Sequence, residues 1–239
     1  QTCALPIFLE FLGNKLEKQI NVEQTMYAIL SNYPTQLTTA KVSLDINSVG
    51  GPKVAKKIVL LSEIGQTDIY RAVTNNKGIM NGVDSVLVAT GNDYRGVEAA
   101  TAVWANKDGS YTSLSKWSIA NDRLIGTVTI PLAIGVVGGS IKARQDIQQS
   151  FNLLGKVSAE QLAEIIAATG LANNFSALLA ISTKGIQAGH MKLQARNLIA
   201  TLKANEDEKA KVLEKLQESK QYTQEAAVRF LDEIRREKN

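Results

Sequence analysis

Residues 75–95 read NNKGIMNGVDSVLVATGNDYR, and this stretch decides the fold predicted for the middle of the chain. Its first eight residues are rich in Asn and Gly, which are typical of turns. Residues 83–88 then predict a short, buried apolar strand. Polar and charged residues stand on both sides of that strand, among them Arg71, Lys77 and Asp93. Polar groups at the two ends of a buried strand can converge, so the stretch predicts a candidate site.

Toward the N-terminus, the pattern predicts a small α/β layer. Residues 8–20 have a broad apolar face typical of a helix. Residues 25–32 and 40–46 are predicted strands, and the second alternates apolar and polar side chains. A turn cluster and a helix over 53–64 follow.

Toward the C-terminus, a helix is predicted over 97–106 and a hairpin over 111–118 and 124–130. Helices dominate from Ser158 onward, where Ser158 and Gln161 fit a capping box. We expect Gly170 to end the first of these helices and a second to cover 171–183. A third helix is predicted near His190, with Ala195, Leu198 and Leu202 at helical spacing. A last helical region is predicted after Asn205, which fits an N-cap.

Composition excludes several classes of protein. The 239 residues carry a net charge of +4, and residues 203–239 hold equal numbers of basic and acidic side chains, so no basic patch suited to nucleic acid is expected. One Cys and one His exclude a disulfide framework and Cys- or His-rich metal sites. No long uninterrupted apolar stretch and no secretory signal are found, so we expect no membrane span and a cytoplasmic protein.

The sequence lacks the common nucleotide-binding and hydrolase motifs. There is no G-x-x-x-x-G-K-[ST] loop, no G-x-G-x-x-G fingerprint and no G-x-S-x-G elbow. A second notable segment, residues 185–191, holds a glycine-flanked His190 at a predicted helix start. A lone His is more often a surface or packed residue than a catalyst, so His190 by itself predicts little.

Three segments together resemble the signature segments of class II 3-hydroxy-3-methylglutaryl-CoA (HMG-CoA) reductases: residues 76–82, 89–95 and 189–197. Their order and spacing match as well, with 16 residues from Lys77 to Asp93 and 97 from Asp93 to His190. The likeness runs nearly continuously from Phe8 to the end of the chain. This family reduces a thioester to an alcohol by two hydride transfers, giving mevalonate and free CoA.

The resemblance implies three catalytic residues. Lys77 matches the lysine that stabilises the negative charge developing on the thioester oxygen. Asp93 matches the aspartate that holds and tunes this lysine. His190 matches the histidine that protonates the departing CoA thiolate, and an imidazole is a suitable acid near neutral pH.

The resemblance also implies binding residues and partners. Arg71 and Asn81 fall on substrate-contacting positions, Asn174 lies on the substrate-side helix, and Asn32 matches a position that contacts the nicotinamide nucleotide. The expected cofactor is NADPH, with NADH as the alternative, and no metal. The expected assembly is a homodimer with the active site at the subunit interface.

The chain departs from the family pattern at several points. Asn75 stands where the family usually has His, and Asn173 where Gln is common; we expect tuning and no loss from either. Residues 1–7 resemble a translated sequencing adapter, and the family's catalytic Glu and Asp-Ala-Met-Gly segment would lie upstream of residue 1. We therefore expect the 239-residue chain alone to be inactive.

The fold class implied by the resemblance is α+β: a large, mainly helical catalytic domain with a small inserted ferredoxin-like α/β nucleotide-binding domain and a C-terminal helical flap. The expected divisions are a leader over 1–7, part of the NAD(P)-binding domain over 8–66, the catalytic domain over 67–184 and the flap over 185–239. Two alternatives stay open. The chain is a non-catalytic fragment with partial CoA-ester binding, or its charged C-terminal helices form an interaction module.

Overall fold

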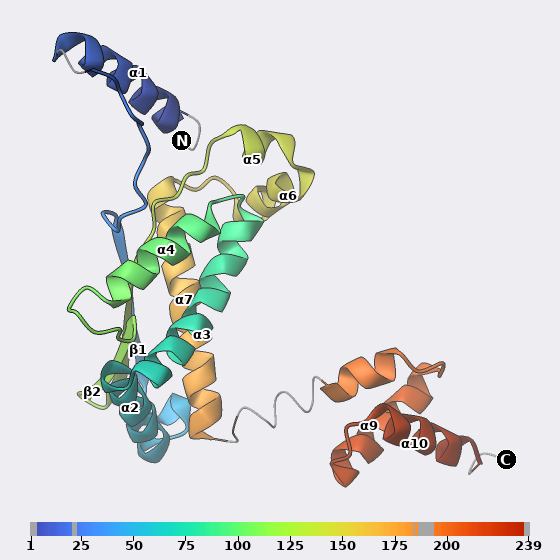
Figure 1. Ribbon diagram of the computed structural model, residues 1–239. Helices are drawn as coiled ribbons and strands as arrows, with labels where there is room; N and C mark the ends of the chain where they lie inside the picture. The colour runs from blue at the N-terminus through green and yellow to red at the C-terminus, as the bar shows by residue number, and fades with distance from the viewer. Residues whose placement is uncertain (1–3, 21–22, 184, 186–193, 237–239) are drawn as a thin grey trace. The chain divides into compact units, whose positions relative to one another are not determined.

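The computed structural model describes residues 4–20, 23–183, 185 and 194–236. They form two compact units, unit 1 over Gln1–Leu179 and unit 2 over Ala180–Asn239. The elements of unit 1 (Figure 1) are α1 (Ala4–Gln19), β1 (Leu37–Asp45), the 3₁₀ turn η1 (Asn47–Val49), α2 (Pro52–Thr67), α3 (Ile69–Ala89), α4 (Tyr94–Ala105), β2 (Ser115–Ala120), β3 (Arg123–Pro131), α5 (Gly139–Ala143), α6 (Gln145–Leu154) and α7 (Ala159–Ser182).

Unit 1 is built on a small antiparallel sheet with strand order β1-β3-β2. The hairpin between β2 and β3 turns at Asn121 and Asp122, whose positive φ angles of 49° and 55° fit a type I′ turn. β1 pairs along its whole length with β3, from Leu37 opposite Pro131 to Asp45 opposite Arg123. The sheet thus joins strands from residues before and after position 67. The chain is mixed α+β and mainly helical, as the sequence predicts at this coarse level.

The core of unit 1 lies between this sheet and the helices α2, α3 and α7. Trp117 of β2, Leu124 and Ile130 of β3, Ile79 of α3 and Ile166 of α7 are all fully buried in one cluster. By length and composition α7 could cross a membrane, yet its buried face supplies this cluster. A core helix satisfies the same criteria, and here α7 packs as one.

The structure corrects the prediction at the stretch that opened the sequence analysis. Residues 75–89 are not a turn followed by a strand, because they belong to the continuous helix α3. Asp68 caps its N-terminus by accepting a hydrogen bond from the backbone N–H of Arg71 at 3.0 Å. The weak helix propensity of Asn and Gly is overridden by tertiary contacts along the buried face.

The prediction that Gly170 ends a helix is also wrong. Gly170 lies inside α7, where a Cβ would stand only 2.9 Å from Val83 Cγ2 and 3.2 Å from Ile79 Cγ2 of α3. Gly82 of α3 is equally confined, because a Cβ there would stand 3.0 Å from the carbonyl oxygen of Thr169 of α7. The two glycines therefore allow α3 and α7 to approach closely, and α7 continues to Ser182 as one helix.

Other predictions fare differently. The strand predicted over 25–32 is wrong, because these residues have no ladder partner among the described residues and form no regular element. The helices over 8–20 and 53–64, the strand over 40–46 and the hairpin are confirmed within a few residues. The Ser158 capping box is confirmed by hydrogen bonds from Ser158 N to Gln161 Oε1 and from Gln161 N to Ser158 Oγ.

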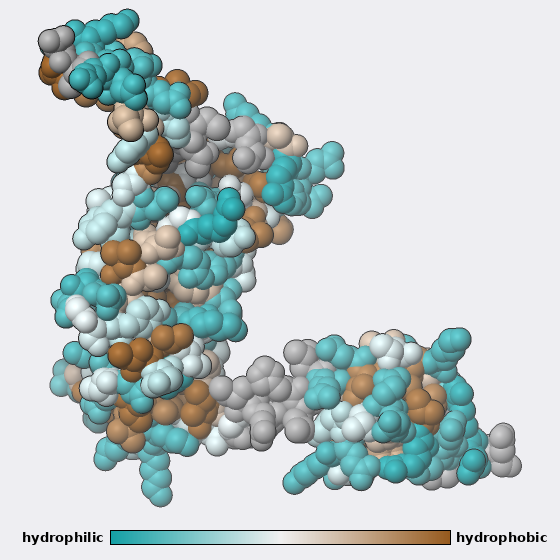
Figure 2. Space-filling model, viewed as in Figure 1, coloured by the Kyte–Doolittle hydropathy of each residue, from teal (hydrophilic) through white to brown (hydrophobic). Residues whose placement is uncertain are grey.

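Unit 2 is all helical in the part that the structure describes. It contains helical residues 194–200, α9 (Glu206–Ser219) and α10 (Gln224–Arg236). Its core gathers Ala195, Val212, Leu216, Ala227 and Ile234, with Leu198 packed against them. The predicted N-cap at Asn205 is confirmed as a full capping box with Glu208. Figure 2 shows apolar areas (brown) on the predominantly polar surface of each unit.

Candidate active site

Helix α3 carries three of the predicted site residues. Arg71 lies in its first turn and is partly buried, whereas Lys77 and Asn81 lie one turn apart on an exposed face. Tyr70, Val73 and Val88 are large exposed side chains at helical spacing on this same face. The structure thus brings a cation and an amide together on one accessible surface of the helix.

Asp93 caps the N-terminus of the next helix, α4, by accepting a hydrogen bond from Gly96 N at 3.2 Å. Asn32 is brought close to it from far away in sequence. A Cβ built on Gly96 would stand 2.9 Å from Asp93 Oδ2 and 3.0 Å from Asn32 Oδ1. The predicted catalytic carboxylate and the predicted cofactor-binding amide therefore lie close together against the backbone of Gly96, at the N-terminus of α4.

Lys77 and Asp93 do not meet within one chain. Lys77 stands 12 residues before the end of α3 at Ala89, a rise of roughly 18 Å along the helix axis. Asp93 lies beyond that end. In the described part of the chain no ion pair or hydrogen bond joins the two side chains.

Asn174, predicted to bind substrate, lies in the interior of unit 1 and is 1% exposed. Its Oδ1 accepts hydrogen bonds from Trp117 Nε1 at 2.8 Å and from Ser115 Oγ at 2.9 Å. Its Nδ2 donates to Asn75 Oδ1 at 2.9 Å. Both ends of this amide are thus engaged by protein groups, and its role as a substrate contact stays a prediction.

Sequence reasoning did not foresee the buried polar cluster around Asn174. Asn75 Nδ2 donates to Ser113 Oγ at 2.6 Å and to Ser115 Oγ at 3.2 Å. Asn173 donates from Nδ2 to the carbonyl of Gly78, next to Lys77. The signal was present: if 69–89 is a helix, Asn75 falls on the same face as Ile79 and Val83 and must lie in the core.

Arg71 stands at the edge of this cluster. Its Nη2 donates to Asn75 Oδ1 at 3.4 Å, and no carboxylate pairs with its guanidinium among the described residues. Burial lowers the pKa of Arg71 below its ordinary value. A half-buried guanidinium without a carboxylate is suited to bind an anionic ligand, because such a ligand replaces the lost hydration.

Asp84, one turn after Asn81, was also missed. Its Oδ1 is buried and makes no hydrogen bond within the described ranges. Burial, a hydrogen bond with the Glu98 side chain of α4 and the negative charge of Glu98 together raise the pKa of Asp84 to about 7. One of the two carboxyls must hold a proton for this hydrogen bond to form.

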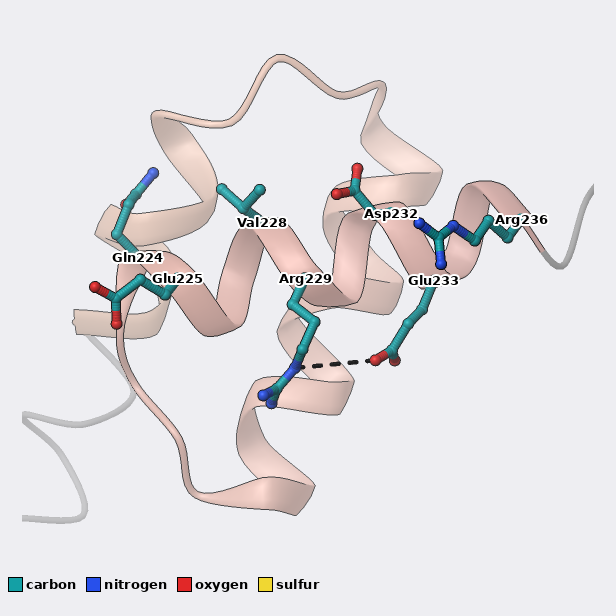
Figure 3. Close-up of a pocket in the computed structure, with 7 residues that line it drawn as sticks. All are labelled: Gln224, Glu225, Val228, Arg229, Asp232, Glu233 and Arg236. Atoms are coloured by element: carbon teal, nitrogen blue, oxygen red, sulfur yellow. Dashed lines mark ion pairs between the residues drawn. The ribbon is translucent and has the colours of Figure 1, made fainter.

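A hollow of about 700 Å³ lies elsewhere, on α10 of unit 2. Figure 3 shows that its lining side chains project from this one helix, with Arg229 paired to Glu233 at 3.9 Å. Charges of both signs alternate along it, and no predicted site residue belongs to it.

Residues 4–20, 23–183, 185 and 194–236 hold no group of three His, Cys, Asp or Glu side chains placed to bind a metal. His190 lies outside the described residues.

Comparison with known proteins now defines the class of the chain. Residues 5–195 match the family described as hydroxymethylglutaryl-coenzyme A reductase. The chain belongs to this family, which confirms the resemblance drawn from the three sequence segments. It is 42% identical over 188 residues to the 3-hydroxy-3-methylglutaryl-coenzyme A reductase of Archaeoglobus fulgidus, covering 78% of this chain and 43% of that protein.

Two further relatives agree. A probable 3-hydroxy-3-methylglutaryl-coenzyme A reductase of Borreliella burgdorferi is 38% identical over 219 residues, covering 87% of this chain and 51% of that protein. The class II reductase of Streptococcus pneumoniae, solved with NADPH in open conformations, is 42% identical with a TM-score of 0.70, covering 97% of this chain and 57% of that one. The chain thus spans about half the length of the curated relatives it matches.

Proposed function

We propose that the protein formed by this chain reduces HMG-CoA to mevalonate and CoA, with two nicotinamide dinucleotides as hydride donors. The observation that carries this proposal is the family match over residues 5–195, which includes Lys77 and Asp93. The structure supports it in that Lys77 and Asn81 share an accessible face of α3, while Asp93 lies beside Asn32.

Each residue has a chemical role in this proposal. Hydride addition to a thioester carbonyl places negative charge on its oxygen, and the Lys77 ammonium stabilises that charge. Asp93 orients the ammonium. Arg71 and Asn81 bind the substrate, and the positive charge of Arg71 pairs with the carboxylate of the substrate.

His190 completes the proposed chemistry as the acid that protonates the CoA thiolate when the hemithioacetal collapses. We place it on a C-terminal flap, residues 185–239, which closes over the site and excludes water.

The cofactor proposed is NADPH in preference to NADH, since the relative from Streptococcus pneumoniae binds NADPH. The nicotinamide ring supplies the hydride. Gly96 has no side chain, and this lets the Asn32 amide and the Asp93 carboxylate both lie close against the first turn of α4. Asn32 would hold the nucleotide beside Asp93, at the positive end of α4.

We further propose a homodimer in which Lys77 of one protomer meets Asp93 of its partner. The separation of the two residues along α3 supports this arrangement, because one chain does not bring them together. The exposed Tyr70, Val73 and Val88 beside Lys77 supply an apolar surface for such a contact. The dimer would therefore complete two identical sites.

The test is oxidation of NADPH in the presence of HMG-CoA, followed by absorbance, for the full-length protein that contains this chain and for its Lys77→Ala variant. We expect Lys77→Ala to lower kcat by roughly a hundredfold or more, as does loss of an oxyanion-stabilising group. Lys56→Ala removes an exposed lysine of α2 and serves as the matched control. Equal rates for the two variants would contradict the role of Lys77. HMG-CoA binding without any turnover would favour the alternative of a CoA-ester-binding fragment.

A further inference from the structure

A chain of buried amides links the core of unit 1 to the surface at Arg71. Trp117 Nε1 of β2 donates to Asn174 Oδ1 of α7, and Asn174 Nδ2 donates to Asn75 Oδ1 of α3. The same Asn75 Oδ1 accepts from Arg71 Nη2, one helical turn earlier. Helices α3 and α7, which are distant in sequence, thus meet at Asn75 Oδ1, and β2 joins them through Asn174.

The orientation of Asn75 is fixed by its neighbours. Its Nδ2 donates to both Ser113 Oγ and Ser115 Oγ, so the amide nitrogen must face β2 and the amide oxygen must face Arg71. Asn75 is 7% exposed, which leaves its side chain little freedom to rotate. The acceptor presented to Arg71 is therefore held by the core and does not depend on solvent.

We propose that Asn75 is a positioning residue that orders the Arg71 guanidinium, and that Asn174 acts through Asn75 to hold it there. This inference rests on the proposed function, in which Arg71 binds the substrate carboxylate. One neutral acceptor fixes the guanidinium without neutralising it, so its remaining N–H donors and its full charge stay available to the anion. An ordered cation loses less conformational entropy when the anion binds.

Asn76 supplies the contrast that separates positioning from simple core support. It is as buried as Asn75, and it also joins α3 to the segment before β2: Nδ2 donates to the Thr112 carbonyl at 2.9 Å, and Oδ1 accepts from Leu114 N at 2.9 Å. It makes no contact with Arg71 among the hydrogen bonds of the described residues. Asn76→Ala is therefore the matched control: it removes a similarly buried amide but leaves the hydrogen bond to Arg71 in place.

The direct test is nuclear magnetic resonance of the Arg71 side chain, assigned with Arg71→Lys. We expect rotation of the guanidinium to become about fivefold faster in Asn75→Ala and in Asn174→Ala, the factor that one hydrogen bond contributes. It should be unchanged in Asn76→Ala, and Asn75→Asp, which keeps the acceptor, should keep the slow rotation. Equal rotation rates in Asn75→Ala, Asn76→Ala and the unsubstituted protein would overturn the proposal.

The second arm measures the affinity for HMG-CoA by calorimetry. We expect Asn75→Ala to weaken binding about fivefold relative to Asn76→Ala, and expect no further loss when Asn75→Ala is added to Arg71→Ala. Additive losses in that pair would overturn the proposal, because Asn75 would then act independently of Arg71. If HMG-CoA binds to none of the proteins, the proposed function fails, while the Arg71 spectra still decide whether Asn75 positions it.

Discussion

Two helix pairs in this chain are held together by different means. In unit 1, α3 crosses α7 at Gly82 and Gly170, with Asn75 and Asn174 bonded across the contact. In unit 2, α9 and α10 meet through apolar stripes that include Leu216 and Ile234. The first contact depends on close backbones and uncharged amides, whereas the second depends on side-chain burial.

The polar groups at the two helix contacts also differ: unit 2 uses a charged pair, whereas unit 1 uses neutral amides. In unit 2 the buried carboxylate of Glu208 accepts hydrogen bonds from Arg235 Nε at 3.0 Å and Nη2 at 3.2 Å, and it also caps α9. These interactions lie at the N-terminal end of α9, where the ion pair with Arg235 also joins α9 to α10. The amides of unit 1 lie inside α3 and α7, away from the helix ends and close to the proposed site residue Arg71. The comparison shows that the helix pair with the closer backbones is the one beside the proposed site.

The largest effect is expected from filling the close approach in unit 1. In Gly82→Ala the new Cβ would stand 3.0 Å from the Thr169 carbonyl and 3.1 Å from Asn173 Cβ. In Gly78→Ala, on the same helix, the Cβ would meet nothing within 4 Å. We expect Gly78→Ala to raise the free energy of unfolding by about 0.5–1 kcal/mol. Gly82→Ala should fall below it by about 1–3 kcal/mol because of overpacking.

Chemical denaturation of the two variants measures this difference, and the matched helix position removes the contribution of helix propensity. If both alanines stabilise the protein equally, the close contact between α3 and α7 is not as tight as described. The α9–α10 pair would then no longer be the looser of the two.

A smaller effect is expected from the capping box of unit 2. Asn205 Oδ1 accepts from Glu208 N at 2.9 Å, and Asn205 N donates to Glu208 Oε2 at 3.0 Å. Asn205→Ala should therefore destabilise α9 by about 1 kcal/mol. Hydrogen exchange should become faster at amides of α9 and stay unchanged in α3 and α7. Faster exchange in both pairs would show that the two units do not unfold separately.

The two pairs also explain which parts of the fold could be predicted. The signals for α9 are local: Asn205 before acidic residues, followed by apolar residues at helical spacing, and the prediction was confirmed. The signals for α3 were misleading, because Asn75, Gly78 and Gly82 resemble turn formers when read locally. Their reasons for being in a helix lie in α7 and β2, which no local pattern can show.

The same limit applies to the candidate site. Lys77, Asn81, Asp93 and His190 were named from three sequence segments, and the other site residues from the family resemblance. The family itself is confirmed. The pairing of Asn32 with Asp93 around Gly96 brings together residues more than 60 positions apart, and sequence spacing does not show it. The interior position of Asn174 likewise depended on reading 69–89 as a helix.

The last effect depends on pH and concerns a carboxyl pair formed by Asp84 of α3 and Glu98 of α4. Burial first, then the hydrogen bond and charge of Glu98, raise the pKa of Asp84 from 3.8 to about 7. Between about pH 4 and pH 7 the folded chain therefore binds more protons than the unfolded chain, so the free energy of unfolding falls as pH rises through this window. Above about pH 7 both states have lost the proton and the dependence ends. Asp84→Asn should abolish this slope, and Glu98→Gln should reduce it because burial alone is left. Denaturation curves across the window measure both; an undiminished slope in Asp84→Asn would assign the proton to another group and leave the α3–α4 contact without a buried acid.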